Sequence, residues 1–127
     1  MSMPGTTNWK PLPTERVVTC NPRLLQGKHL LVGIIRVRNE SLIIRDTLDY
    51  VGNFVDAIIA YDDASTDETL AILKNHSKTA MVIENHKWQE EVYARLQAET
   101  RHRGLLLELV RRNLNTEWIY CFDADER

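Results

Sequence analysis

Residues 57–68 read AIIAYDDASTDE, an apolar run followed directly by acidic and hydroxyl side chains. Short β-branched runs of this kind are typical of strands that are buried on both faces of a parallel sheet. The same pattern of an apolar run and then a polar cluster occurs at 30–40 (LLVGIIRVRNE) and at 117–127 (EWIYCFDADER). A further apolar run at 80–83 predicts another strand, which makes four.

Helical patterns separate these four runs. A helix over about 41–51 has a capping residue, Ser41, at its start. Ser65 and Glu68 match a capping box, which predicts a second helix after the run at 57–61. Residues 89–114 predict a third, long helix with an apolar face. Strands that alternate with helices in this way predict an α/β fold with a Rossmann-like parallel sheet and flanking helices.

The first 28 residues differ from the rest of the chain. They hold all four prolines and only short apolar clusters, so we expect an extended or partly disordered leader over 1–28. Residues 29–127 are then expected to form one α/β domain. Because the sequence stops on a strand with no helix to cover it, we expect this domain to be truncated after that strand, as the N-terminal half of a longer unit.

The composition argues against several classes of protein. A net charge of −2 argues against a nucleic-acid binder that relies on a basic surface. There is no apolar run of about 18 residues, so we expect no membrane segment. The two cysteines, Cys20 and Cys121, form no cysteine-rich framework, which favours a cytoplasmic location. A disulfide between them stays open at this stage.

Three polar clusters, at 36–40, 62–67 and 123–127, each follow a predicted strand. The carboxyl ends of parallel strands lie along one edge of a sheet, so we expect these clusters to meet in one cleft. Two adjacent carboxylates such as Asp62 and Asp63 repel each other unless they have different partners. One can bind backbone amides, and the other can accept hydrogen bonds from a ligand. The alternative is a purely local loop and helix cap.

Asp123 and Asp125 form an Asp-x-Asp string after the last strand. Residues i and i+2 of an extended chain point to the same side, so both carboxylates can approach one cation. A hard divalent ion could take its remaining oxygens from water and a phosphate. The alternative is a solvated loop.

A cationic set precedes the apolar part of the third helix: Arg95, Arg101, His102 and Arg103. Arginine forks grip phosphate in a bidentate manner, so these residues could steady a diphosphate. Alternatively they lie on a solvated helix face beside glutamates. No glycine-rich phosphate loop follows any of the predicted strands.

Three strings taken in order, VGIIRVRNE at 32–40, IIAYDDASTDET at 58–69 and WIYCFDADE at 118–126, resemble a family 2 glycosyltransferase of the glycosyltransferase-A fold. The resemblance covers residues 30–127 and implies the nucleotide-sugar-binding half of such an enzyme. It implies a UDP- or GDP-sugar donor, a divalent Mn²⁺ or Mg²⁺ ion, and a glycan or other hydroxyl acceptor. Sugar transfer would be metal-dependent and inverting, with the general base expected beyond residue 127.

The resemblance also implies roles for single residues. Asp63 is similar to the residue that contacts the base, and Arg101 or Arg103 matches an arginine near the donor phosphates. Asp125 would bind the metal directly, and Asp123 would lie close to the metal and to the ribose or sugar. The residues implied to line the nucleotide-sugar pocket are Arg36, Arg38, Glu40, Asp63, Arg101, Arg103 and Asp123.

Two other functions stay open. The chain could be a non-catalytic module that binds a nucleotide or a partner, or a nucleotidyltransferase-like enzyme of phosphate chemistry. The second class usually carries a glycine-rich signature after its first strand, and residues 36–40 contain no glycine. An exposed strand edge at the end of the sheet could also support an oligomer.

Overall fold

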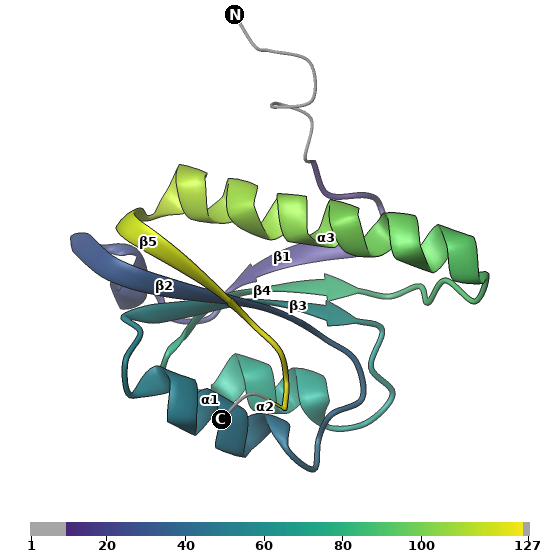
Figure 1. The fold of residues 1–127 in the computed structure, drawn as a ribbon, viewed down its shortest axis with the longest axis horizontal. Coiled ribbons are helices and arrows are strands. Elements are labelled where there is room, and N and C mark those ends of the chain that lie inside the picture. Colours follow the sequence, from purple (N-terminus) through teal and green to yellow (C-terminus); the bar gives the residue numbers. More distant parts are fainter. Residues whose placement is uncertain (1–9, 126–127) are drawn as a thin grey trace, which may run out of the picture.

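The structure, a computed structural model, describes residues 10–125. These residues form a five-stranded sheet with helices packed against it (Figure 1). The strand order is β1-β4-β3-β2-β5. The strands are β1 (Glu15–Thr19), β2 (Lys28–Val37), β3 (Ala57–Asp63), β4 (Thr79–Asn85) and β5 (Asn115–Phe122). The helices are α1 (Ile44–Gly52), α2 (Thr69–Asn75), α3 (Val92–Asn113) and a 3-10 helix (Pro22–Leu25).

Strands β2, β3, β4 and β5 are mutually parallel, as the sequence predicted. β2 pairs with β3 on one side and with β5 on the other, so that Ile34 lies opposite both Ile59 and Cys121. β3 also pairs with β4 in parallel. A helix connects each of these strands to the next along the chain. The prediction of an α/β, Rossmann-like sheet with flanking helices is therefore confirmed.

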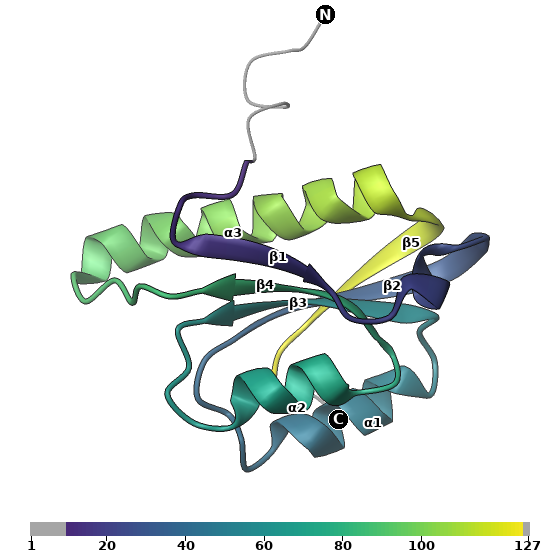
Figure 2. The same ribbon diagram turned by 180° about the vertical axis from the view of Figure 1, so that it is seen from behind.

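The sheet is mixed rather than purely parallel, because the segment expected as a leader contributes a strand. β1 pairs antiparallel with β4, with Val17 opposite Ile83, and forms one edge of the sheet (Figure 2). The sheet therefore begins before residue 29. β1 is only five residues long and starts with Glu15 and Arg16, so its local pattern is too polar and too short to predict a strand.

Helices cover both faces of the sheet (Figures 1 and 2). α3 packs on one face, where Leu105 and Leu106 meet side chains such as Ile34 and Ile59. α1 and α2 pack on the other face, over a second buried cluster that includes Ile35. Neighbouring residues of a strand point to opposite faces, so each continuous apolar run supplies both clusters at once.

The helix starts differ from those predicted. α1 begins at Ile44 rather than near Ser41, and no side chain caps it. The capping box is wrong as well, because the Ser65 hydroxyl donates to Asp62 Oδ1 at 2.6 Å instead of capping α2. The same hydroxyl accepts from the backbone N–H of Asn39 at 2.9 Å. Ser65 thus holds the loops after β2 and β3 together rather than capping α2.

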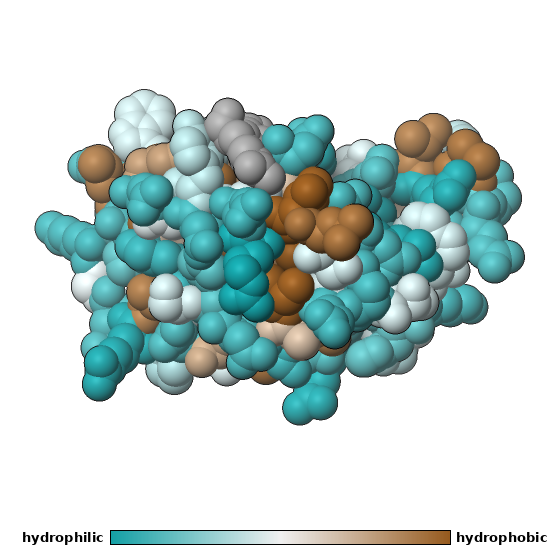
Figure 3. Space-filling model, turned by 90° about the horizontal axis from the view of Figure 1, so that it is seen from below, coloured by the Kyte–Doolittle hydropathy of each residue, from teal (hydrophilic) through white to brown (hydrophobic). Residues whose placement is uncertain are grey.

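β5 is an edge strand and largely exposed, although its sequence suggested a buried one. Within the described residues 10–125 it pairs only with β2, and its Trp118 side chain is 68% exposed. Seen from below, over α1 and α2, the molecule presents mostly hydrophilic side chains around a small hydrophobic group (Figure 3). None of the described helices is long and apolar enough to cross a membrane.

The two cysteines are free thiols. Cys121 is exposed on β5, whereas Cys20 is half-buried after β1. Burial raises the pKa of the Cys20 thiol above its ordinary value. The disulfide left open by the sequence is not formed in this structure.

The absence of a side chain at Gly33 on β2 lets the Phe122 ring of β5 lie close to the β2 backbone. A Cβ atom on Gly33 would lie 3.0 Å from Phe122 Cε1 and 3.6 Å from Val55 Cγ1. We expect Gly33→Val to lower the free energy of unfolding by about 1–3 kcal/mol, because overpacking forces neighbouring side chains out of their preferred rotamers. Urea denaturation followed by circular dichroism measures this change.

Leu30→Val is the matched control, because Leu30 lies on the same strand and is 62% exposed. It should change the free energy of unfolding by no more than about 0.5 kcal/mol. Equal effects of the two substitutions would contradict the close packing of β2 against Phe122.

Candidate functional site

A cleft of about 400 Å³ lies where β2 and β5 end. Its lining residues are Arg36, Arg38, Glu40, Asp123, Ala124 and Asp125. Arg36 lies near the end of β2, and Arg38 and Glu40 follow that strand. The other three follow β5, which is far from β2 in the sequence. Parallel pairing brings them together, since Ile35 lies opposite Phe122 at the end of the ladder. The structure thus gathers five of the site residues expected from the sequence into one cleft.

The Asp-Ala-Asp turn is tied to α1. The Thr47 hydroxyl, which is fully buried, donates a hydrogen bond to the Ala124 carbonyl between the two aspartates. Asp123 and Asp125 themselves are exposed. Thr47 was not singled out by the sequence, because a threonine within a helix gives no signal of a contact so distant along the chain.

Arg36 is held by side chains from two other elements. Its Nη2 donates to Asp63 Oδ2 on β3 at 2.5 Å. Its Nη1 donates to Glu99 Oε1 on α3 at 3.2 Å, and its Nε donates to His102 Nδ1 on the same helix at 2.8 Å. The Arg36 side chain is only 15% exposed. Three bonds in three directions fix its guanidinium at the end of β2.

Asp62 and Asp63 have separate partners, as their adjacency requires. Asp62 accepts hydrogen bonds from the Ser65 hydroxyl and the Ser65 backbone N–H. Burial raises the pKa of Asp62 even though these bonds favour the carboxylate. Asp63 binds Arg36 through one oxygen and accepts from Asn85 Nδ2 at 2.7 Å through the other. Asp63 is 3% exposed and does not line the cleft.

His102 is a neutral hydrogen-bond acceptor rather than a member of a cationic set. Its Nδ1 accepts from Arg36, so the ring proton lies on Nε2. Burial lowers the pKa of His102 to about 4, and the nearby positive charges of Arg36 and Arg101 act in the same direction. The ring also stacks on Tyr61, with 3.9 Å between centroids.

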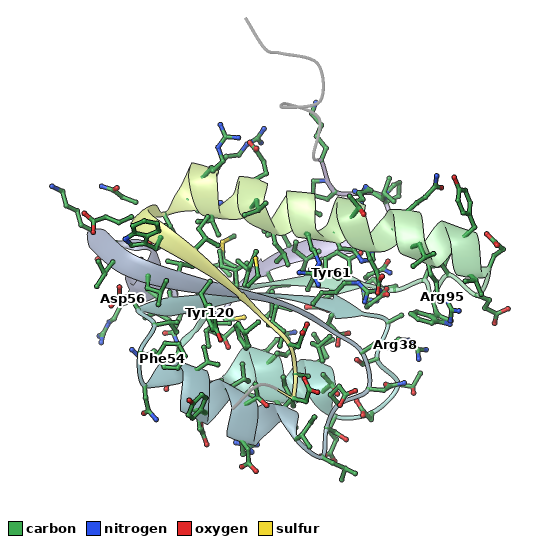
Figure 4. The ribbon with its side chains drawn as sticks, in the orientation of Figure 1. Arg38, Phe54, Asp56, Tyr61, Arg95 and Tyr120 are labelled. Atoms are coloured by element: carbon green, nitrogen blue, oxygen red, sulfur yellow. The ribbon has the colours of Figure 1, made fainter. Side chains whose placement is uncertain are left out.

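A second cavity, of about 280 Å³, shares Arg36 and Arg38 with the first. The Arg38 guanidinium carbon lies 4.0 Å from the centroid of the Trp88 ring, and that of Arg95 lies 5.3 Å from it. Arg38 and Arg95 come together at the same end of the sheet (Figure 4). Both contacts are cation–π interactions. Trp88 was not among the site residues predicted from the sequence. Its position shortly after the end of a strand could have indicated that it lies near the site.

Arg101 and Arg103 do not line either cavity. Arg101 forms two hydrogen bonds with Glu15 on β1, at 2.6 and 2.8 Å, and Arg103 is exposed. Burial disfavours the charge on Glu15, but hydrogen bonds from Arg101, Leu12 and Tyr61 outweigh it and lower the pKa of the carboxyl. The sequence predicted that both arginines lie on a helix, but it could not show which side of that helix faces the cleft.

The fit of a metal ion to this cleft rests on two carboxylates. Among the described residues, no group of three or more His, Cys, Asp or Glu side chains is arranged to hold a metal ion. Asp123 and Asp125 are both exposed at the cleft. Mg²⁺ is commonly held by one or two carboxylates together with waters and substrate phosphates, so this donor set fits such an ion.

Open α/β sheets bind their ligands in a crevice at the carboxyl ends of the parallel strands. The polar cleft of this chain lies at that place. A family model described as glycosyl transferase family 2 matches residues 34–127, which include every residue of the two cavities. The chain therefore belongs to glycosyl transferase family 2. A comparison with curated proteins gives no match.

The lowered pKa of His102 makes a prediction about pH. An unfolded histidine titrates near 6.5, so between pH 6.5 and about 4 the unfolded chain binds a proton that native His102 does not. The stability that His102 contributes is thus complete above pH 6.5 and is lost as the pH falls towards 4. Between pH 7 and pH 5 we expect a loss on the order of 2 kcal/mol from this residue.

Chemical denaturation of the wild type and His102→Asn at both pH values measures this contribution. Asparagine can still accept from Arg36 but does not titrate. The variant should therefore lose less stability than the wild type on acidification. The same loss in both proteins would show that His102 is not buried as a neutral ring.

Proposed function

We propose that this chain binds the donor of a metal-dependent, inverting glycosyltransferase, with a nucleotide-diphospho-sugar such as a UDP- or GDP-sugar in the cleft after β2 and β5. The observation that carries the proposal is the meeting of Arg36, Arg38 and Glu40 with Asp123 and Asp125 around one cavity. Arginine forks match phosphate oxygens, and the two aspartates can share a divalent ion with the same diphosphate.

In the proposed reaction, the hydroxyl oxygen of a glycan or other acceptor attacks the anomeric carbon from the face opposite the diphosphate. The bond from the anomeric carbon to the diphosphate oxygen breaks, and that oxygen leaves with the electron pair. The acceptor proton passes to a general base. Arg36 and Arg38 stabilise the charge on the leaving diphosphate. A bound Mn²⁺ or Mg²⁺ would supply Lewis-acid stabilisation of the same group.

Asp123 and Asp125 have different roles in this proposal. Asp125 would hold the ion directly, and Asp123 would lie close to the ion and nearer the ribose or sugar. Glu40 lines the same cavity, and its backbone position is fixed because its N–H donates to the Thr69 hydroxyl at 2.9 Å. A preformed pocket of this kind lowers the cost of ordering side chains around a ligand.

Isothermal titration calorimetry of the chain with UDP and with GDP, each with and without Mn²⁺, tests the proposal. We expect one nucleotide to bind and its affinity to fall at least tenfold when Mn²⁺ is withheld. Asp125→Ala should remove the metal-dependent part of the affinity while leaving the melting temperature nearly unchanged, because Asp125 is exposed and lies outside the core.

Glu117→Ala is the control, because Glu117 is also exposed but lies near the opposite end of β5. It should leave the affinity unchanged. If the folded wild type binds neither nucleotide under either condition, the cleft is not a donor site and the proposal is wrong. Unfolding of Asp125→Ala would instead assign that aspartate a structural role.

A further inference from the structure

We propose that Thr47 on α1 is a positioning residue for the Asp-Ala-Asp turn, which orients the two carboxylates before an ion binds and does not itself touch the ion. The contact that carries this inference is the hydrogen bond from the Thr47 hydroxyl to the Ala124 carbonyl, between Asp123 and Asp125. The inference rests on the proposed function, in which those two aspartates hold a divalent ion.

The Asp-Ala-Asp turn lies beyond the end of the sheet. The ladder between β2 and β5 ends with Ile35 opposite Phe122, so the turn follows the last paired residue of β5 as that strand runs towards α1 (Figure 1). Within the described residues 10–125, no hydrogen bond other than the one from Thr47 reaches Ala124 or Asp125. The hydroxyl on α1 is therefore the polar contact that fixes the middle of the turn.

The three residues of the turn differ in exposure in a way that suits this role. Ala124 is half-buried and packs against the core cluster beneath α1. Asp123 and Asp125 are exposed, and both line the cleft. Because the middle residue is held on α1, the two flanking carboxylates are left on the side of the cleft.

Thr47 is the polar member of an otherwise apolar helix face. The buried residues of α1 are Ile44, Thr47, Leu48 and Val51. The bland explanation is that the hydroxyl bonds within its own helix, since Thr47 Oγ1 also lies 3.2 Å from the Ile43 carbonyl oxygen. A hydroxyl carries one proton and can donate to one of the two carbonyls at a time, and that of Ala124 is the closer. A threonine that served only its helix would need no acceptor on the far side of the sheet edge.

A fixed turn favours ion binding for two reasons. Two carboxylates on a free turn would repel each other and would lose conformational freedom when an ion drew them together. A turn that is already ordered does not pay this cost again on binding. Loss of a partner that orients metal ligands typically lowers metal affinity about 10–100-fold.

Thr47→Val and Thr47→Ser separate the hydroxyl from the methyl group. The probe is Mn²⁺ together with UDP or GDP (whichever binds the wild type), and electron paramagnetic resonance of the free ion gives its affinity. Thr47→Val lacks the donor and should weaken Mn²⁺ binding about tenfold or more. Thr47→Ser keeps the donor and should retain most of the affinity. A purely structural role predicts the opposite order, because serine lacks the buried methyl group.

Thr47→Ala also removes the donor and should weaken Mn²⁺ binding as Thr47→Val does, so the result does not depend on how valine packs. In an Asp125→Ala background, Thr47→Val should have no further effect on Mn²⁺ affinity, since coupled residues are not additive. Melting temperatures show which variants are folded.

Thr79→Val is the matched control. Thr79 is also fully buried, but it lies at the start of β4, and its hydroxyl has no hydrogen-bond partner in the described part of the chain. This substitution should leave Mn²⁺ affinity unchanged.

A second readout needs neither metal nor nucleotide. Backbone order parameters of Ala124 and Asp125, from ¹⁵N relaxation of the free protein, should fall in Thr47→Val and stay at the wild-type values in Thr47→Ser and Thr79→Val.

The possible failures of the inference and of the proposed function are distinct. If folded Thr47→Val binds Mn²⁺ as tightly as the wild type, or if Thr47→Ser is the weaker of the two, Thr47 does not position the turn and the inference is wrong, whereas the donor site stands. If the folded wild type binds no Mn²⁺ with either nucleotide, the proposed function fails and the inference fails with it.

Discussion

The ion pair between Arg36 and Asp63 joins the ends of two neighbouring strands, and the polar edge of the sheet is organised around it. Both side chains are largely withdrawn from water, so loss of either partner would leave a buried charge, at a cost of about 3–5 kcal/mol. Glu99 and His102 each accept a further hydrogen bond from Arg36, and Asn85 donates one to the second oxygen of Asp63. The result is a rigid guanidinium that a single surface salt bridge could not provide.

The parallel part of the fold was predictable because each strand is a continuous apolar run and each crossover is a helix. That pattern has few alternative topologies. The same pattern also predicted the cleft lined by residues 36–40 and 123–125. These residues lie at the ends of β2 and β5, so the pairing of the two strands is enough to bring them together. The residues that carry the family resemblance lie at the same edge of the sheet as these polar clusters.

The parts that could not be predicted depend on contacts distant along the chain. β1 pairs with β4, and Arg101 and Tyr61 bind the Glu15 carboxylate at its start, but no local pattern reveals such partners. The direction of Arg101 depends on the rotation of α3, in which each residue turns about 100° from the last. Asp63 and His102 were recognised as polar residues, but their burial and pairing follow only from the packing of α3 on the sheet.

The exposure of β5 has a practical consequence for the chemistry of the chain. Cys121 presents its thiol to solvent two residues before Asp123, whereas Cys20 is half-buried and burial raises the pKa of its thiol. Thiol reagents at neutral pH should therefore discriminate between them, because the thiolate is the reactive form. A fluorophore or spin label attached to the natural sequence would lie beside the cleft and report on whatever enters it.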